Sequence, residues 1–151
     1  MTSVTLEAMQ VRELLRRKGS GVATVDPGAS VTAVLSMLSE LGIGALVVSA
    51  DGVKVEGIVS ERDIVRRLAR DGVITLELLA RDVMTHDVVT CEPDVKVDEI
   101  MSVMTEGRFR HVPVTELGLL IGIVSIGDIV NARVRELEQE AHHLTNYISG
   151  Y

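Results

Sequence analysis

The apolar and polar positions of this chain predict the same series of elements twice. A short β-rich run comes first, at residues 22–25 and again at 88–90, and each is followed by a turn that contains proline. Apolar residues at i, i+3, i+4 and i+7 come next, which is typical of one face of a helix. Two strand patterns and a second helix, which begins at Ser60 or Ser125, complete each copy. Each copy therefore reads β-α-β-β-α.

These patterns can be located residue by residue. In the first copy the apolar helix positions are Val31, Val34, Leu35, Leu38 and Leu41. The strands of the first copy are "ALVVS" and "VEGIVS", and the turn "SADG" lies between them. The strands of the second copy are "HVPVT" and "LLIGIVS", with the turn "TELG" between them. Residues 9–19 and 78–85 precede the two copies, and both predict short helices.

The two copies also align as an internal repeat of roughly 60 residues. Asp26-Pro27 falls on Glu92-Pro93, and Gly57 falls on Gly122. The phrase "GIVSERDIV" at 57–65 returns as "GIVSIGDIV" at 122–130, and seven of the nine positions agree. Neither copy is expected to bury the faces of its sheet alone. We therefore expect an α+β fold in which the two copies pack together as one domain.

The last helix of the second copy is expected to continue through "NARVRELEQEAHHL". Its apolar residues have a spacing close to 3.5 and are Val130, Val134, Leu137, Ala141, Leu144 and Ile148. Such a stripe either docks on its own domain or contacts a partner helix, and the sequence leaves both alternatives open. The predicted organisation is an N-terminal helical segment (1–19), repeat 1 (20–72), a linker with a short helix (73–87), repeat 2 (88–134) and a C-terminal helical extension (135–151).

Composition excludes several classes of function. The chain has 151 residues, 46% of them hydrophobic, so a packed core is expected. A net charge of −7 and an aromatic content of 2% argue against a nucleic-acid partner. No apolar run reaches the ~18 residues that a membrane span needs. The N-terminus also lacks the pattern of a signal peptide, so we expect a soluble, cytoplasmic protein with no membrane partner.

The repeated Ser-x-x-Asp phrase, Ser60 to Asp63 and Ser125 to Asp128, has two interpretations. A serine at a helix N-cap with an acidic residue three positions later forms a capping box, which stabilises the helix by ~1 kcal/mol. The same helix N-terminus offers unpaired N–H groups to a phosphate. An aspartate one turn into the helix can accept two hydrogen bonds from a vicinal diol such as that of ribose. The two roles are compatible.

These motifs carry a family resemblance. The doubled unit resembles a tandem pair of cystathionine-β-synthase (CBS) domains, a Bateman module, over about residues 11–134. Its marks are "DVMTHDVVTCEPDVKVDEIMSVMTEGRFRHVPV" and the two "GIVS" phrases that lead into Asp63 and Asp128. The resemblance implies two repeats about a pseudo-twofold axis, two clefts between them, and a homodimer. It also implies an adenosine-containing ligand such as AMP, ADP, ATP or NAD, with S-adenosylmethionine as a further family ligand.

The resemblance carries over to particular residues. It implies that Asp63 and Asp128 hold ribose, that Ser60 and Ser125 lie near ribose or phosphate, and that the threonines at the ends of the first strands line the clefts. Those threonines are Thr24 and Thr90. In relatives, a basic pair before one second strand reaches the phosphates held by the other copy's aspartate. Here that pair is Arg110 and His111, and the first copy has only glycine and alanine there. We therefore expect a phosphate clamp at Asp63 and none at Asp128.

Other signals are weak. Cys91 has no second cysteine to pair with and is interpreted as a buried thiol. The chain contains no GxSxG, P-loop or HExxH motif, so no catalytic residue, no required cofactor and no metal site is expected. The leading hypothesis is a stand-alone, non-enzymatic sensor of adenine nucleotides that acts through its dimer or an unknown protein partner. The alternative is a homodimeric scaffold whose clefts hold no physiological nucleotide.

Overall fold

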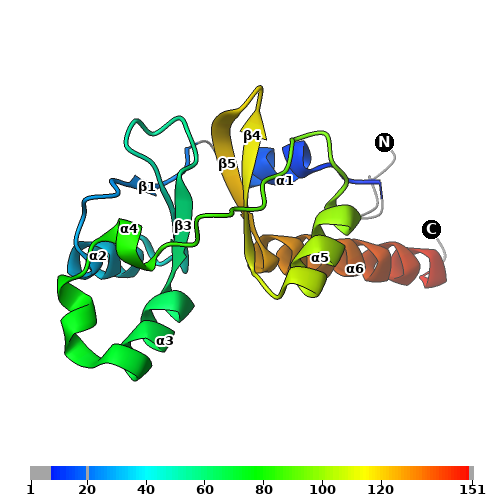
Figure 1. The fold of residues 1–151 in the computed structure, drawn as a ribbon. Coiled ribbons are helices and arrows are strands. Elements are labelled where there is room, and N and C mark those ends of the chain that lie inside the picture. Colours follow the sequence, from blue (N-terminus) through cyan, green and yellow to red (C-terminus); the bar gives the residue numbers. More distant parts are fainter. Residues whose placement is uncertain (1–7, 20, 150–151) are drawn as a thin grey trace. The chain divides into compact units, whose positions relative to one another are not determined.

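In a computed structural model of the chain, residues 8–19 and 21–149 are described (Figure 1). The described chain contains both helices and strands, which confirms the α+β class with two repeats. The elements are α1 (Val11–Lys18), β1 (Thr24–Val25), α2 (Val31–Leu41), β2 (Ala45–Val48), β3 (Gly57–Ser60), α3 (Glu61–Asp71), the 3₁₀ helix η1 (Gly72–Glu77), α4 (Ala80–Val83), α5 (Val97–Gly107), β4 (His111–Glu116), β5 (Leu119–Ser125) and α6 (Ile126–Ile148).

The chain forms two compact units, which are described separately. Unit A combines residues 21–90 with the hairpin tip at 113–122, and unit B combines residues 8–19, 91–112 and 123–149. Each unit contains one Ser-x-x-Asp phrase. Ser60 and Asp63 belong to unit A, and Ser125 and Asp128 belong to unit B.

Unit A is built on the three-stranded sheet β1-β2-β3. β1 runs parallel to β2, and β2 runs antiparallel to β3 with Ala45 opposite Ser60 and Val48 opposite Gly57. All four residues of β2 are buried, as expected for a central strand that is covered on both faces. The buried core residues are Val25, Val31, Val34, Leu38, Leu46, Val48, Val59, Ile64, Ala80 and Val83. This core holds the end of β3, and with it Ser60, in place.

Unit B contains α1, α5, α6 and the inner ends of the β4–β5 hairpin. The N-terminal helix α1 joins it through backbone hydrogen bonds, Val11 N–H to Val95 O (2.9 Å) and Val97 N–H to Met9 O (2.9 Å). Its buried residues are Met9, Val11, Leu14, Cys91, Val97, Ile100, Met104, Val112, Val124, Ile129 and Ala132. The helix that precedes the first repeat in sequence therefore packs with the second repeat.

The short helix α4 makes the same kind of junction in unit A. Ala80 N–H donates to Ala29 O at 2.7 Å, and Ser30 and Leu79 form an isolated antiparallel bridge. Gln10 and Lys96 form the matching bridge in unit B. Each short helix thus packs beside the start of the first long helix of its unit. The sequence predicts these two short helices at residues 9–19 and 78–85, one before each copy.

One predicted strand does not form. Residues 88–90 have no strand structure, and only the next residue, Cys91, takes part in a single β-bridge. Val88 N–H donates to His86 O at 3.0 Å, so this N–H is used in a tight turn that leads into residues 88–90 and does not donate to a neighbouring strand. Thr90 is consequently an exposed coil residue, whereas its counterpart Thr24 lies half-buried in β1.

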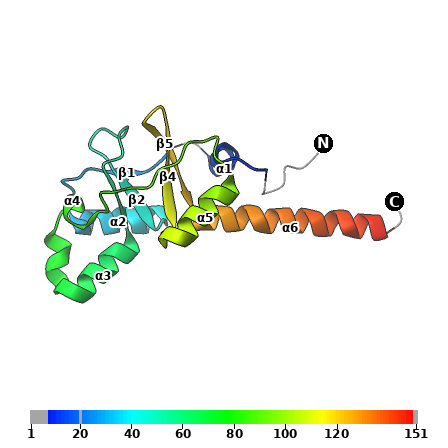
Figure 2. The same cartoon turned by 45° about the vertical axis from the view of Figure 1, so that its right-hand side comes forward.

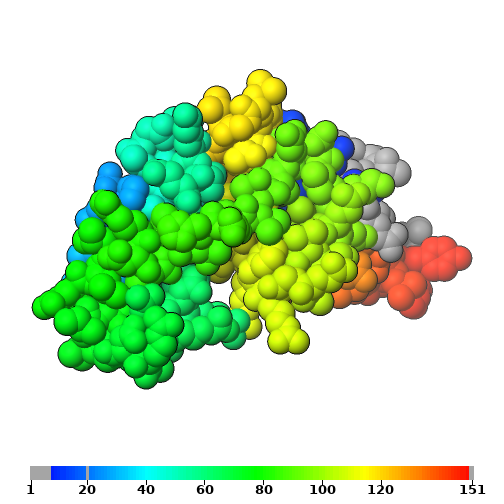
Figure 3. Space-filling view, in the orientation of Figure 1, coloured from blue at the N-terminus to red at the C-terminus, as the bar shows by residue number. Residues whose placement is uncertain are grey.

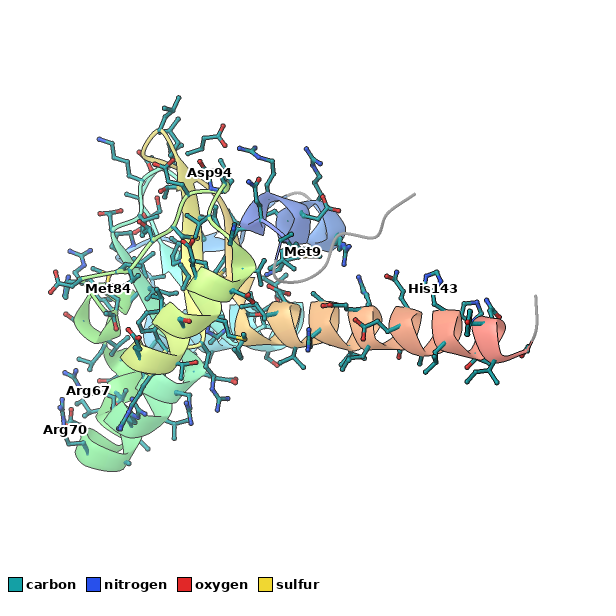
Figure 4. All side chains as sticks on the ribbon, turned by 90° about the vertical axis from the view of Figure 1, so that its right-hand side faces the viewer. Met9, Arg67, Arg70, Met84, Asp94 and His143 are labelled. Atoms are coloured by element: carbon teal, nitrogen blue, oxygen red, sulfur yellow. The ribbon has the colours of Figure 1, made fainter. Side chains whose placement is uncertain are left out.

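The C-terminal helix α6 runs without interruption for 23 residues, as predicted (Figure 2). It buries Ile129 and Ala132, but the apolar stripe that begins at Val130 is exposed. Leu144 and Ile148 are 60% and 75% exposed. The end of α6, coloured red, lies at the surface in Figure 3, and the side chains around His143 in Figure 4 project outward. The interpretation in which the stripe docks on its own unit is therefore wrong.

Candidate functional site

The first candidate site is the junction of β3 and α3 in unit A. Ser60 is the N-cap of α3 and accepts a hydrogen bond from Asp63 N–H at 3.2 Å through Oγ. In return, Oδ2 of Asp63 accepts from Ser60 N–H at 3.2 Å and from Ser60 Oγ–H at 2.9 Å. This is a complete capping box, so the capping interpretation is confirmed here. Within the described chain, Oδ1 of Asp63 accepts no hydrogen bond.

The second candidate site repeats this arrangement at the junction of β5 and α6 in unit B. Ser125 Oγ accepts from Asp128 N–H at 3.1 Å, and Oδ2 of Asp128 accepts from Ser125 N–H at 2.8 Å. The capping box is again complete. Both copies therefore place a half-buried carboxylate at a helix N-terminus, with one carboxylate oxygen committed to the cap. The second oxygen is the one that a ligand could use.

The two sites differ in their surroundings, because the two middle residues of the Ser-x-x-Asp phrase differ between the copies. Glu61 and Arg62 are exposed charges on the first turn of α3. Ile126 is half-buried and Gly127 is exposed on the first turn of α6. Among the described residues, a Cβ atom added at Gly127 would meet Ser125 Oγ alone, at 3.6 Å, so the first turn of α6 is uncrowded at this position.

The other predicted site residues divide between the units. Thr24 belongs to unit A with Asp63, and Thr90 is also in unit A. Arg110 and His111 belong to unit B, where Arg110 is exposed and its carbonyl accepts from Ile126 N–H at 2.9 Å. The predicted role of Arg110 and His111 at Asp63, and that of Thr90 in a nucleotide site, stay predictions.

Lys18 is a further charged residue beside Asp128, and the sequence analysis does not predict it. Its Nζ lies 2.9 Å from Oδ2 of Asp128 and 2.9 Å from the carbonyl oxygen of Ile123. It comes from the last residue of α1, before the first repeat begins, so an alignment of the repeats gives no signal for it. The sequence offers one clue, which is the basic ending "RRKG" of this helix. That the helix packs with the second repeat is visible in the structure alone.

A pocket of about 70 Å³ lies beside this ion pair, between α1 and α6 of unit B. Its lining residues are Leu14, Arg17, Lys18, Asp128, Asn131, Ala132 and Arg135. Three of these are cationic and one is anionic, so the pocket carries a local positive charge in a chain whose net charge is −7. The expectation that Asp128 has no phosphate clamp stays a prediction, but the structure places cationic side chains beside this carboxylate.

Comparison with protein families agrees with this doubled arrangement. The model of the CBS domain matches the chain twice, at residues 11–70 and 80–135. The chain belongs to the CBS domain family.

Known CBS proteins resemble the chain over most of its length. The mitochondrial CBS domain-containing protein CBSX3 of Arabidopsis thaliana is 32% identical over 95% of this chain and 74% of its own. The crystal structure of the CBS-domain containing protein ATU1752 from Agrobacterium tumefaciens matches with a TM-score of 0.79 and 48% identity, over 83% of this chain and 99% of that one. The CBS domain pair of protein MJ0100, solved with 5′-methylthioadenosine and S-adenosyl-L-methionine, shares the fold with a TM-score of 0.72 and 24% identity, over 82% and 94% of the two chains.

The thiol of Cys91 is a further chemical group of this CBS protein. Cys91 is buried, as predicted, and burial raises the pKa of its thiol to about 11. A thiol with such a pKa is almost fully protonated at neutral pH and is a poor nucleophile.

Among the described helices, none is both long enough and apolar enough to cross a membrane.

Proposed function

We propose that this CBS protein is a regulatory module that binds an adenine nucleotide, of the AMP, ADP, ATP or NAD type, at its Ser-x-x-Asp sites. The observation that carries the proposal is the paired capping box. In both copies one carboxylate oxygen is held by the helix cap, and the other accepts no hydrogen bond from the described residues. A carboxylate fixed in this way at a helix N-terminus suits a ribose diol, and the helix N-terminus suits a nearby phosphate.

The aliphatic character of the chain agrees with this ligand class. Aromatic residues make up only 2% of the sequence, so adenine would rest against aliphatic side chains and backbone groups. Adenosine compounds are also what the related CBS pair of protein MJ0100 holds, although the likeness there is one of fold. The proposal keeps the cleft-lining roles that the family resemblance implies for Thr24 and Thr90. It also keeps the phosphate-binding role that the resemblance implies for Arg110 and His111.

The proposed role is binding without catalysis. The capping boxes commit Ser60 and Ser125 to backbone N–H groups, and within the described chain neither serine has a histidine as a hydrogen-bond partner to act as a base. Ligand binding can then regulate an unknown protein partner only by favouring one of two states of the module. The nucleotide is thus the signal and not a substrate.

Thermal unfolding of the full chain with AMP, ADP, ATP, NAD, NADH and S-adenosylmethionine tests the proposal. A ligand at 100 times its Kd adds about 2.7 kcal/mol to the free energy of unfolding. We expect a rise in Tm with at least one of the nucleotides, reduced in Asp63→Ala or in Asp128→Ala. Absence of any shift in the wild-type chain, at millimolar concentrations of all six compounds, contradicts the proposal.

The exposed stripe on α6 supports a second candidate, a homodimeric scaffold without a physiological nucleotide. Its apolar residues occupy alternate a and d positions of a heptad repeat: Val134, Ala141 and Ile148 at a, and Val130, Leu137 and Leu144 at d. Mostly β-branched residues at a with mostly leucine at d favour parallel, two-stranded coiled coils. In such a pair Arg133 at g faces Glu138 at e of the second copy, so the facing charges are opposite. The second candidate therefore has another copy of this chain as its partner.

Sedimentation equilibrium of Leu137→Asp and of the matched variant Gln139→Asp separates the two candidates. Both positions are exposed on α6, but only Leu137 lies in the apolar stripe. A dimer that Leu137→Asp dissociates, in a protein that shifts with no nucleotide, favours the scaffold. A nucleotide-dependent rise in Tm that persists in Leu137→Asp favours the sensor.

A further inference from the structure

We infer that Lys18 and its neighbours make the Asp128 site selective for adenosine compounds that carry a phosphate, over adenosine compounds that are neutral or cationic. The inference rests on the proposed function, because it concerns which adenosine compound one of the two sites accepts. It starts from the ion pair between α1 and α6 and from the charges of the pocket beside it.

The ion pair leaves both partners with unused bonding capacity. A lysine ammonium has three N–H donors. Lys18 uses two of them among the described residues, on Oδ2 of Asp128 and on the carbonyl oxygen of Ile123, both at 2.9 Å. Oδ2 of Asp128 accepts hydrogen bonds from both Lys18 Nζ–H and Ser125 N–H, and Oδ1 accepts none from the described residues. An acceptor oxygen for a diol and a donor for an anion therefore lie side by side.

Two arginines extend this positive charge. Arg17 and Arg135 line the same pocket as Lys18 and Asp128. Arg17 shares its charge with Glu13, at 3.7 Å on α1, whereas Arg135 has no ion pair among the described residues. The side chains of Lys18 and Asp128 are 38% and 22% exposed, so a ligand from solvent can reach both. The pocket offers one carboxylate among three cations.

The charges discriminate between ligands that share adenosine. AMP presents a 2′,3′-diol to the carboxylate and a dianionic 5′-phosphate to the cations. 5′-Methylthioadenosine has the same nucleoside but a neutral 5′ group, so it gains nothing from Lys18. S-adenosylmethionine carries a sulfonium charge at the 5′ position, which the three cations repel. The expected order of affinity at this site is AMP, then methylthioadenosine, then S-adenosylmethionine.

Isothermal titration of the full chain with AMP and with 5′-methylthioadenosine tests this order. Asp63→Asn serves as the background, because it weakens the other site while an amide oxygen can still accept from Ser60 N–H. Lys18→Met removes the ammonium and keeps an unbranched apolar side chain. Arg16→Gln is the matched control, since it removes one charge from the same turn of α1 but lies outside the pocket lining.

We expect AMP to bind at least about tenfold more tightly than methylthioadenosine, the size expected for a charge-assisted hydrogen bond. Lys18→Met is expected to remove most of that ratio, while Arg16→Gln leaves it unchanged and Lys18→Arg largely restores it. An equal affinity for the two compounds in the parent, or a ratio that Lys18→Met does not alter, overturns the inference and leaves the proposed function standing. Failure of every adenosine compound to bind in the wild-type chain overturns the proposed function itself.

A second measurement covers the case in which Lys18→Met loosens α1. In the Asp63→Asn protein, salt screens the attraction between a phosphate and the three cations but leaves a neutral ligand unaffected. We expect the Kd of AMP to rise several-fold between 50 and 500 mM NaCl, with that of methylthioadenosine constant. Parallel behaviour of the two ligands overturns the inference without any change at Lys18.

Discussion

Gly42 and Arg108 end the first long helix of their respective repeats, and both have a left-handed backbone, with φ of 64° and 57°. The N–H of Gly42 donates to Leu38 O, and that of Arg108 donates to the matching Met104 O. The same helix end is therefore built with glycine in one repeat and with arginine in the other. Because a side chain at such a φ is strained, the second repeat carries a local cost that the first avoids.

Replacing Arg108 with glycine is expected to stabilise the protein. Relief of the left-handed strain, about 1–2 kcal/mol, exceeds the entropy that glycine adds to the unfolded chain, so we expect a net gain of about 0.5–1 kcal/mol. Urea unfolding at neutral pH measures it. The matched variant Gly42→Ala is expected to lose about 1 kcal/mol, and a loss of stability in Arg108→Gly contradicts the account of the cap.

Removing either serine cap is expected to destabilise the helix that follows it. Ser60→Ala and Ser125→Ala each delete the oxygen that accepts an N–H at the third residue of the helix, which costs about 1 kcal/mol. Ser102→Ala, in the exposed middle of α5, is the control and leaves stability within about 0.5 kcal/mol. The midpoints of denaturant unfolding of the three variants measure these changes in stability. Identical midpoints for all of them contradict a capping role.

Gly57 is expected to tolerate no side chain. A Cβ atom there would lie 2.9 Å from the carbonyl oxygen of Thr85 and would collide with the side chain of Met84. Because one of these contacts is backbone, Gly57→Ala is expected to lose about 1–3 kcal/mol of unfolding free energy.

Gly127 provides the control for this substitution. It lies in the first turn of α6, where an added Cβ atom would make an ordinary contact with Ser125 Oγ at 3.6 Å, so Gly127→Ala is expected to gain up to about 1 kcal/mol from helix propensity. Thermal unfolding of the two variants compares them directly. A Gly57→Ala protein as stable as the wild type shows that β3 and Thr85 lie farther apart than described.

The buried thiol of Cys91 predicts a pH dependence. Its pKa is about 11 in the folded protein and 9.0 ordinarily, because burial disfavours the thiolate. The folded state therefore holds the proton more tightly than the unfolded state does. The stabilising contribution is complete below pH 9 and is lost as the pH rises through 11.

Comparison with Cys91→Ala isolates this effect from the titration of lysine and tyrosine. Between pH 8 and 11 the unfolding free energy of the wild type is expected to fall by about 2 kcal/mol more than that of the variant. Urea unfolding at a series of pH values measures the difference. Curves that stay parallel over this range contradict a buried thiol.

The pattern of apolar residues predicts most of the local structure, because local periodicity reports local burial. The observed β4 (His111–Glu116) and β5 (Leu119–Ser125) lie where "HVPVT" and "LLIGIVS" indicate. The same reasoning fails at residues 88–90, which have β propensity but form no strand and follow a tight turn from His86 to Val88. It also cannot find Lys18, whose place beside Asp128 arises from packing between residues about 110 positions apart. Periodicity in sequence carries no record of such a contact.

Equilibrium binding of AMP to the full-length protein, with Asp63→Asn/Asp128→Asn as the comparison, tests the central claim most directly. The two substitutions change one oxygen in each carboxylate and leave an acceptor for each helix cap. Saturable binding to the wild type and a loss of at least about tenfold in affinity in the double variant are the predicted results. Equal binding by both proteins, or none by the wild type, contradicts a ribose site at the Ser-x-x-Asp carboxylates.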